Sequence, residues 1–301
     1  MNRHDDVYPS RYQATASILE RQDPVIYSDQ DADADLPIHA GLLQAYADQG
    51  YLSLEGFFSE DELAPYQEEL HRLRTQKDIT TLPEVVFEPG SADVRSIFYI
   101  HRTNEVLRGL LYDQRLLAIV KYLLGGEVYI HQSRINYKPG FTGQAFDWHS
   151  DFETWHVEDG MPRMRALSCS ISLSENNEFN GPLMVIPGSH QWYISCIGQT
   201  PEDHYKTSLQ KQEYGVPDHN SIRHLVDRGG IVAPKGPAGS VTVFDCNLMH
   251  GSGPNLTPWA RNNIFCVYNS VENMLIQPFG NRDARPEFIA ARQDVAPLEP
   301  V

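Results

Sequence analysis

The middle of this 301-residue chain carries the stretch Phe146-Asp147-Trp148-His149-Ser150-Asp151-Phe152-Glu153-Thr154-Trp155-His156. Its most informative feature is the pair His149 and Asp151, two positions apart. In an extended strand, residues i and i+2 project from one face, so an imidazole and a carboxylate would lie together. Such a pair can supply two ligands of a metal site. A hydrogen-bonded His–Asp pair in a half-buried strand is the alternative, and the pair alone does not decide between them.

The His-x-Asp spacing by itself is a weak signal. It also occurs at His4-Asp5-Asp6, in an acidic segment where no strand pattern would aim both side chains, and we expect no site there. The pair at His149 differs because aromatic residues surround it: Phe146, Trp148, Phe152 and Trp155. Aromatic walls would keep water away from a reactive metal centre.

A second histidine completes the ligand set. His250 follows the strand-like run 241–244 and stands directly before Gly251, at a glycine-bounded turn. Arg261, eleven residues later, opens another strand pattern, and its planar fork suits a carboxylate. Two histidines and one carboxylate with open positions are typical of non-haem Fe(II) oxygenases. With an arginine for the distal carboxylate, the constellation predicts a 2-oxoglutarate-dependent dioxygenase.

The sequence pattern changes from helical to strand-like near residue 126. Ser59 and Glu62 form a capping-box pattern that predicts a helix through about Gln76. The leucine-rich stretch 106–124 predicts further helix, ended by Gly125-Gly126. Short strand patterns with Gly/Pro turns follow, at 128–137, 167–173, 183–186, 240–244 and 263–268. The pattern favours a mostly β fold with flanking helices, either a sandwich or a barrel.

The chain therefore divides into an arm and one domain. Residues 1–35 are predicted to be an acidic, loosely ordered arm, because the run 28–35 is too acidic to pack alone. Residues 36–301 form the domain. Its parts are a helical buttress at about 36–125, a β core at about 126–270 and a C-terminal segment at 271–301, and the polar stretch 198–228 is predicted to be a lid or insertion.

The composition excludes several classes of protein. Lys plus Arg is 24 against 40 for Asp plus Glu, a formal net charge of -16, so we expect no nucleic-acid or anionic-membrane binding. No apolar run approaches a membrane span, and the polar start predicts a cytoplasmic protein. The cysteines Cys169, Cys196, Cys246 and Cys266 are scattered, which argues against a thiolate zinc site.

The order His-x-Asp, distant His, then Arg resembles the phytanoyl-CoA dioxygenase-like superfamily. Within it, the block 146–162 is similar to the signature of the ectoine hydroxylases, and the likeness extends over nearly the whole chain. This resemblance implies a double-stranded β-helix (jelly-roll, cupin-like) core. It implies that ectoine is the substrate and that Fe(II), 2-oxoglutarate and O2 take part in the reaction. The products would be 5-hydroxyectoine, succinate and CO2, and the protein would be a homodimer.

The resemblance also implies roles for individual residues. The metal ligands are His149, Asp151 and His250. The predicted 2-oxoglutarate contacts are Arg261 and Ser252, with Lys138, Asn136 and Phe98. The substrate contacts are Trp155, Phe244 and Phe265 as walls, Gln132 and Thr154 as hydrogen-bonding groups, and Arg285 as a carboxylate partner. From the residues alone, the alternating polar groups along 132–138 could equally face solvent, and Phe244 and Phe265 could be core packing.

Two further histidines are predicted to be non-ligands: His190, because the triad is complete without it, and His131, which we expect to be structural. Three other functions stay open at this point. The chain could be a 2-oxoglutarate-dependent hydroxylase of another small substrate. It could be a zinc hydrolase with the same three ligands, although hydrolysis has no use for Arg261. It could also be a jelly-roll binding protein without activity.

Overall fold

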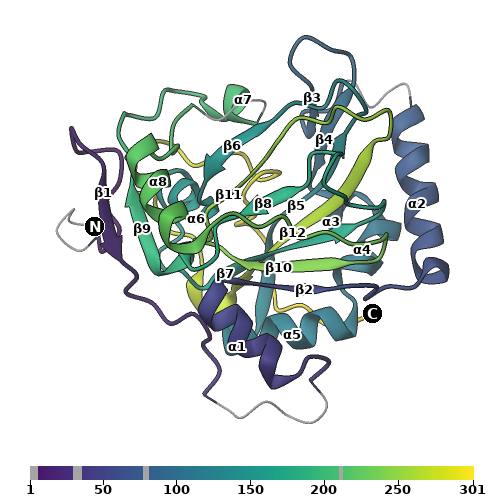
Figure 1. Ribbon diagram of the computed structural model, residues 1–301, viewed down its shortest axis with the longest axis horizontal. Helices are drawn as coiled ribbons and strands as arrows, with labels where there is room; N and C mark the ends of the chain where they lie inside the picture. The colour runs from purple at the N-terminus through teal and green to yellow at the C-terminus, as the bar shows by residue number, and fades with distance from the viewer. Residues whose placement is uncertain (1–5, 30–35, 77–80, 210–212) are drawn as a thin grey trace.

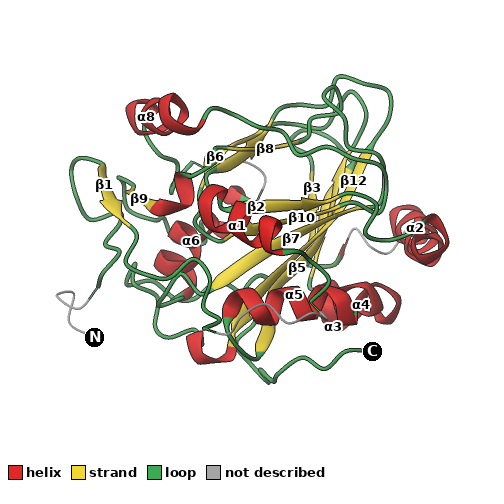
Figure 2. Cartoon of the chain, turned by 60° about the horizontal axis from the view of Figure 1, so that its bottom comes forward, coloured by secondary structure: helices red, strands yellow, loops and turns green. Residues whose placement is uncertain are grey.

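The computed structural model describes residues 6–29, 36–76, 81–209 and 213–301. Among them, a seven-stranded antiparallel sheet forms the largest element, in the order β2-β10-β7-β12-β5-β4-β3. A three-stranded sheet, β6-β11-β8, covers one of its faces, and helices α3, α4 and α5 cover the other (Figures 1 and 2). The chain is thus mostly β with flanking helices, as predicted.

The bounds of the elements are as follows. The large sheet comprises β2 (Tyr51–Leu54), β3 (Val85–Phe87), β4 (Val94–Phe98), β5 (Val128–Lys138), β7 (Ala166–Ser172), β10 (Val241–Asp245) and β12 (Arg261–Ser270). The small sheet comprises β6 (Phe146–His149), β8 (Leu183–Val185) and β11 (His250–Ser252), and β1 (Ser17–Glu20) pairs with β9 (Trp192–Ser195). The helices are α1 (Ala40–Gln49), α2 (Glu60–Thr75), α3 (Ile100–Thr103), α4 (Glu105–Leu111), α5 (Gln114–Leu124), α6 (Asp151–Thr154), α7 (Tyr205–Ser208) and α8 (His219–Gly229), with the π-helix η3 (Trp155–Asp159) and the short 3₁₀ turns η4 (Ser189–Gln191) and η5 (Val271–Asn273).

The predicted start of α2 and the predicted end of α5 are confirmed, but one boundary between them is not predicted. Ser59 and Glu62 form the predicted capping box at the start of α2, which satisfies backbone N–H groups that have no partner inside the helix. The leucine-rich stretch forms two helices instead of one, because the Asp113 side chain accepts hydrogen bonds from two backbone N–H groups and starts α5. Gly125 ends α5 with φ of 65°, a conformation that glycine adopts without strain.

Strand β5 shows how the large sheet separates a core from a site. Ile135 and Tyr137 pack against the helices in the main apolar core. Gln132 and Lys138, on the alternating polar positions, are also buried, at 4% and 3% exposure. Because these polar groups do not face water, the alternative of a solvent-facing sheet face is wrong. The sheet has an apolar face toward the helices and a buried polar face toward the small sheet.

The N-terminal segment differs from the expected loose arm where it is described. Within residues 6–29, β1 pairs with β9, and Tyr8, Ser10 and Arg11 are buried. This packing is possible because the stretch before the acidic run carries aromatic and aliphatic side chains, and Tyr8 lies in a cluster with Phe152 and Tyr193. Most of the acidic run 28–35, namely residues 30–35, lies outside the described residues.

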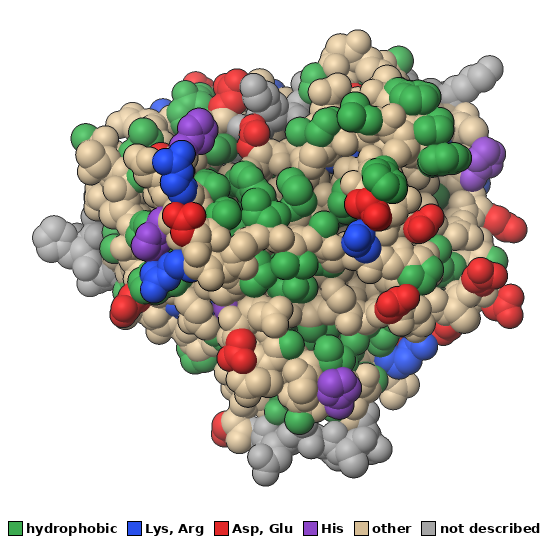
Figure 3. Space-filling view, viewed as in Figure 1, with side chains coloured by type: hydrophobic (Ala, Val, Ile, Leu, Met, Phe, Trp, Pro, Cys, Tyr) green, Lys and Arg blue, Asp and Glu red, His purple; other side chains and the backbone are tan. Residues whose placement is uncertain are grey.

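No helix within the described ranges is long and apolar enough to cross a bilayer. On the face of the molecule drawn in Figure 3, apolar side chains gather across the middle, and charged side chains of both signs are scattered around them.

Candidate metal centre and its two pockets

His149, Asp151 and His250 meet between the two sheets. One ligand atom from each lies within 4.8 Å of the others. His149 is the last residue of β6 and His250 the first of β11, and the two stand directly opposite each other in the antiparallel pair. Their Nε2 atoms lie 3.6 Å and 3.8 Å from the Asp151 carboxylate oxygens. The three predicted ligands are therefore brought together, as one metal ion requires.

Hydrogen bonds fix the tautomer of both histidines. Nδ1 of His149 lies 2.8 Å from the carbonyl oxygen of Asp147, and Nδ1 of His250 lies 2.9 Å from that of Leu248. A carbonyl oxygen only accepts, so each Nδ1 carries the proton and each Nε2 keeps its lone pair. This arrangement presents both lone pairs to a metal ion, the usual way in which a backbone carbonyl orients a metal-binding histidine.

The strand argument for the His-x-Asp pair is wrong in one respect. Strand β6 ends at His149, and Asp151 is the first residue of helix α6. The two side chains converge because Ser150 turns the chain between strand and helix. The turn is held by the bond from Ser150 Oγ to Asn247 and by the bond from Phe152 N to Cys246 O. A helix start also suits an acidic side chain.

The site holds Asp151 and His250 in the protonation states that a metal needs. Burial alone would raise the pKa of Asp151, but His250, His149 and Arg134 outweigh it and hold that pKa below its usual range. Burial, together with the neighbouring His149, lowers the pKa of His250 to about 4. At neutral pH the aspartate is ionised and His250 is neutral.

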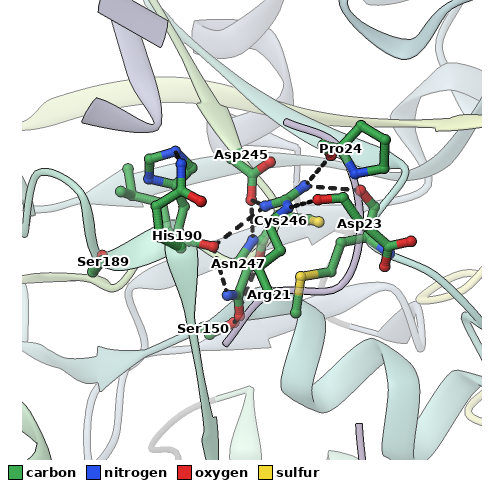
Figure 4. A network of polar contacts seen from close by, with 12 residues as sticks. Arg21, Asp23, Pro24, Ser150, Ser189, His190, Asp245, Cys246 and Asn247 are labelled. Atoms are coloured by element: carbon green, nitrogen blue, oxygen red, sulfur yellow. Dashed lines mark hydrogen bonds and ion pairs between the residues drawn. The ribbon is translucent and has the colours of Figure 1, made fainter. Parts of the chain in front are cut away.

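Contacts behind the ligands hold them in place. Ser168 on β7 donates a hydrogen bond of 3.2 Å to Asp151 Oδ2. Figure 4 shows a second support: Arg21 pairs with Asp245 at 2.8 Å, and Asp245 accepts from the backbone N–H of Asn247 in the turn before His250. Asn247 in turn accepts from Ser150. The turn that carries His250 and the turn that joins the other two ligands are thereby braced against each other.

A pocket of about 70 Å³, here called the inner pocket, opens on one side of the triad. Its wall includes all five predicted 2-oxoglutarate contacts: Phe98, Asn136, Lys138, Ser252 and Arg261. Lys138 Nζ donates to Ser252 Oγ at 2.8 Å and to the Gly253 carbonyl at 2.6 Å. Arg261 is 2% exposed and donates one hydrogen bond, to Asn136.

The inner pocket fits an anion of two carboxylates. Nε and Nη1 of Arg261 have no hydrogen-bond partner among the described residues, although both are buried. Burial, with the neighbouring Arg95, lowers the pKa of this arginine only to about 10, so it stays charged. A buried cation with unused donors is costly unless an anion pairs with it. A keto-acid that reaches from the triad to Arg261 would supply that anion, and the donor set of the triad suits Fe(II).

A second pocket of about 40 Å³, the outer pocket, lies on the other side of the triad and shares His149 and Arg134 with the inner one. Gln132, Thr154, Trp155 and Arg285, four of the predicted substrate contacts, line it. It continues outward into a larger hollow of about 510 Å³, with which it shares Glu158, His204 and Arg285. A small molecule in the outer pocket would lie beside the metal ligands.

The structure places the other two predicted substrate contacts, Phe244 and Phe265, outside the outer pocket, and Arg285 has a different partner from the one expected. Phe265 lines the inner pocket. Phe244 lines neither pocket and packs behind His250, with ring centroids 5.1 Å apart. Arg285 reaches the outer pocket, but its fork already holds Asp159 at 2.7 and 2.6 Å. The prediction made Arg285 a partner of the substrate carboxylate. Two of its donors are already bonded to Asp159, so they are not free for a substrate.

The two histidines predicted to be non-ligands, His190 and His131, do not join the triad. Nε2 of His190 lies 3.1 Å from the carbonyl oxygen of Ala47. His131 lies 3.3 Å from Asp159 and packs edge-on to Trp155. The register of β5 against β12 shifts at His131, because Tyr268 pairs with Ile130 and Val267 with Gln132. This bulge gives His131 contacts next to the outer pocket, which strict alternation would not predict. In the second His-x-Asp match, His4 lies outside the described residues, and Asp6 lies 2.9 Å from Nε2 of His156.

Comparison with known proteins agrees with this geometry. The model of the phytanoyl-CoA dioxygenase (PhyH) family matches residues 46–263. The chain belongs to the phytanoyl-CoA dioxygenase family. Within this family it is 50% identical to the ectoine dioxygenase of Stutzerimonas stutzeri, over 98% of the chain and 97% of the relative. It is 54% identical to the ectoine dioxygenase of Sphingopyxis alaskensis, over 97% and 95%. The predicted resemblance is confirmed.

A solved structure that is 50% identical to this chain has the same fold. The crystal structure of EctD from S. alaskensis with 2-oxoglutarate and 5-hydroxyectoine matches with a TM-score of 0.88 and 50% identity, covering 98% of each chain. The structure of that protein with bound Fe matches with a TM-score of 0.87. With these relatives over nearly the whole chain and with its His-Asp-His triad, this chain is a dioxygenase, and the alternatives of a zinc hydrolase and of a jelly roll without activity are wrong.

Several residues of this PhyH site are missing from the prediction. Arg134 lies between the two pockets, above the rings of Phe98 and Phe265. Arg95 lines the inner pocket from β4, and Glu158 and His204 line the outer one. Arg134 could have been found, since it continues the polar alternation between Gln132 and Asn136. Glu158 lies within the block 146–162, but no spacing rule singles it out, and only the fold brings Arg95 and His204 to the site.

Proposed function

We propose that this protein is an Fe(II)- and 2-oxoglutarate-dependent dioxygenase that hydroxylates ectoine to 5-hydroxyectoine. The observation that carries the reaction type is the triad next to an inner pocket with a buried, partly unpaired Arg261. What supports ectoine as substrate is the likeness to ectoine dioxygenases over nearly the whole chain. When bound, iron with 2-oxoglutarate and O2 supplies an oxidant that replaces a substrate C–H by C–OH and releases succinate and CO2.

The chain's own residues bind and orient the co-substrate. Arg261 is the partner of the distal carboxylate, and Asn136 holds the guanidinium in position through a bond of 3.2 Å. Lys138 and Ser252 lie on the same side of the pocket and add donors. Phe98 and Phe265 provide apolar walls and keep water away from the chain of the keto-acid.

The outer pocket suits ectoine, a small zwitterion with a carboxylate and a delocalised amidinium ring. Trp155 offers an aromatic wall, and Gln132 and Thr154 offer hydrogen bonds. Gln132 is held by its bond to the Ile289 carbonyl and accepts from Arg134, so its orientation is set before a substrate arrives. Holding the substrate next to the ligands is the larger part of what the protein contributes.

The test is ectoine-dependent turnover. Protein purified without oxygen is supplied with Fe(II), 2-oxoglutarate and air, and succinate and hydroxylated product are measured with ectoine, proline or an acyl-CoA as substrate. We expect succinate formation that depends on ectoine and equals the amount of 5-hydroxyectoine. Turnover of proline or acyl-CoA in preference to ectoine would leave the reaction type intact and refute the substrate. Hydrolysis supported by zinc would refute both.

The proposal includes the homodimer and the cytoplasmic location that the resemblance implies, with ectoine, 2-oxoglutarate and O2 as its small-molecule partners. Light scattering of the purified protein gives its mass in solution. A mass of twice the 34.1 kDa of the chain agrees with a dimer, and 34.1 kDa contradicts it.

A further inference from the structure

One buried arginine ties the N-terminal segment to the wall of the outer pocket. Arg11 is 3% exposed and has a φ of 62°, which is uncommon for any residue except glycine. Its backbone N–H donates to the Cys196 carbonyl at 2.8 Å. A strained conformation persists only where surrounding contacts over-determine it, and such positions cluster at functional sites.

The guanidinium of Arg11 contacts two elements at once. Its Nε and Nη2 grip both carboxylate oxygens of Glu153, at 3.0 and 2.7 Å. Nη1 donates to Glu158 at 2.6 Å and to Thr200 at 2.7 Å, and Nη2 lies 3.4 Å from Thr154 Oγ1. Arg11 therefore joins the helical segment 151–159 to the residues that lead into α7.

These partners are part of the site. The segment 151–159 starts with the ligand Asp151, and Thr154, Trp155 and Glu158 line the outer pocket. Its second half is a π-helix, a form that is frequent at functional sites because the wider turn redirects side chains. The direction in which Thr154 and Glu158 point depends on how this segment is held.

Charge explains why an arginine is needed. Glu153 and Glu158 are buried, at 1% and 5% exposure. Within the described ranges, Arg11 is the ion-pair partner of Glu153, while Glu158 has Arg11 at 2.6 Å and Arg285 at 4.0 Å. Arg285 is itself committed to Asp159. Without Arg11, Glu153 would lose its counter-charge and Glu158 would keep only the more distant Arg285, and a buried site tolerates unpaired carboxylates poorly.

We propose that Arg11 is a positioning residue for the substrate side of the active site, acting through Glu153, Glu158 and Thr154. The inference rests on the proposed function and extends it, because it assigns the N-terminal segment to substrate binding. Arg11 does not line the inner pocket, so the binding of 2-oxoglutarate there should be unaffected by its loss.

The experiment compares Arg11→Met with the wild-type protein loaded with iron. We expect the KM for ectoine to rise by about 10-fold or more, as for the loss of a buried charged hydrogen bond, while the KM for 2-oxoglutarate changes less than about 2-fold. Anaerobic titration with ectoine, followed by tryptophan fluorescence, should show the same loss of affinity without turnover, because Trp155 lies in the outer pocket.

Two further variants separate positioning from folding. Arg163→Met removes another ion pair of the N-terminal segment, the 2.7 Å contact with Asp23, away from the outer pocket. We expect it to leave both KM values unchanged. If Arg11→Met does not fold, Glu158→Gln is the second variant. It leaves the ion pair between Arg11 and Glu153 intact and should still raise the KM for ectoine selectively.

The outcomes are distinct. A folded Arg11→Met protein with an unchanged KM for ectoine overturns the inference. Equal losses in both KM values, shared by Arg163→Met, would show a purely structural role and also overturn it. If the wild-type protein does not turn over ectoine at all, the proposed function fails instead.

Discussion

His149 and His250 lie opposite each other in neighbouring strands, and each donates its Nδ1–H to the carbonyl oxygen two residues before it. The same local bond thus sets both rings, whose centroids are 4.2 Å apart. Because each histidine is oriented by the backbone two residues before it, the pair is preorganised before a metal arrives. Asp151, delivered by a helix, completes the set.

Replacing the carboxylate ligand should abolish metal binding and activity. We expect Asp151→Ala to lower ectoine hydroxylation by at least about 100-fold, since even contacts behind a ligand are worth 10- to 100-fold. Iron content after anaerobic loading, measured together with circular dichroism, checks this. A folded variant that keeps its iron and its turnover would show that the aspartate is no ligand.

Removing the arginine of the inner pocket should affect the co-substrate. An arginine–carboxylate contact contributes on the order of 1.5–3 kcal/mol, so Arg261→Ala should raise the KM for 2-oxoglutarate by about 10- to 150-fold. Arg261→Lys keeps the charge but loses the planar fork, so its KM for 2-oxoglutarate should lie between those of the wild-type protein and Arg261→Ala. The KM for ectoine is measured alongside, and a change confined to ectoine would reverse the assignment of the two pockets.

The binding of 2-oxoglutarate should depend on pH through Lys138. Burial, with the nearby Arg261 and Arg95, lowers the pKa of this amine to about 6. A bound carboxylate favours the charged amine and raises its pKa, so binding above pH 6 takes up a proton. Affinity should therefore be greatest at or below about pH 6 and weaken as the pH rises.

Calorimetry in buffers of different ionisation enthalpy measures that proton uptake directly. Lys138→Met should lose most of it, whereas Lys121→Met, which removes an ion pair with Glu127 on the surface, should not. Equal proton uptake by all three proteins would place the titrating group elsewhere.

The serine behind the aspartate should contribute to metal affinity. Ser168 donates to Asp151, so Ser168→Ala is expected to weaken iron binding by about 10-fold. Ser172, on the same strand, accepts from Asn176 instead and gives a matched control. Competition with a metal chelator measures both, and identical behaviour of Ser168→Ala and Ser172→Ala would rule out a role for this hydrogen bond.

The sequence predicts those parts of the fold and site that depend on local pattern. The capping box at Ser59 and the alternation along β5 correspond directly to structure, since both arise from neighbouring residues. The pair His149 and Asp151 is also visible as a motif. Its geometry is not, because a turn at Ser150 places the two residues on different elements.

Residues that act across the chain leave no such signal. Arg11 and Glu158 are 147 positions apart, and only the tertiary fold brings them together. The contacts of His131 depend on a bulge in β5, which strict alternation does not predict. Arg285 is found by resemblance, but its commitment to Asp159 appears only in three dimensions.

The most direct test of the central claim is the fate of oxygen from labelled O2. The loaded protein is given ectoine, 2-oxoglutarate and ¹⁸O2, and both products are examined by mass spectrometry. The account predicts label in 5-hydroxyectoine and in succinate, with equal amounts of the two formed. Product that contains no oxygen from O2, or succinate that forms at the same rate without ectoine, would contradict it.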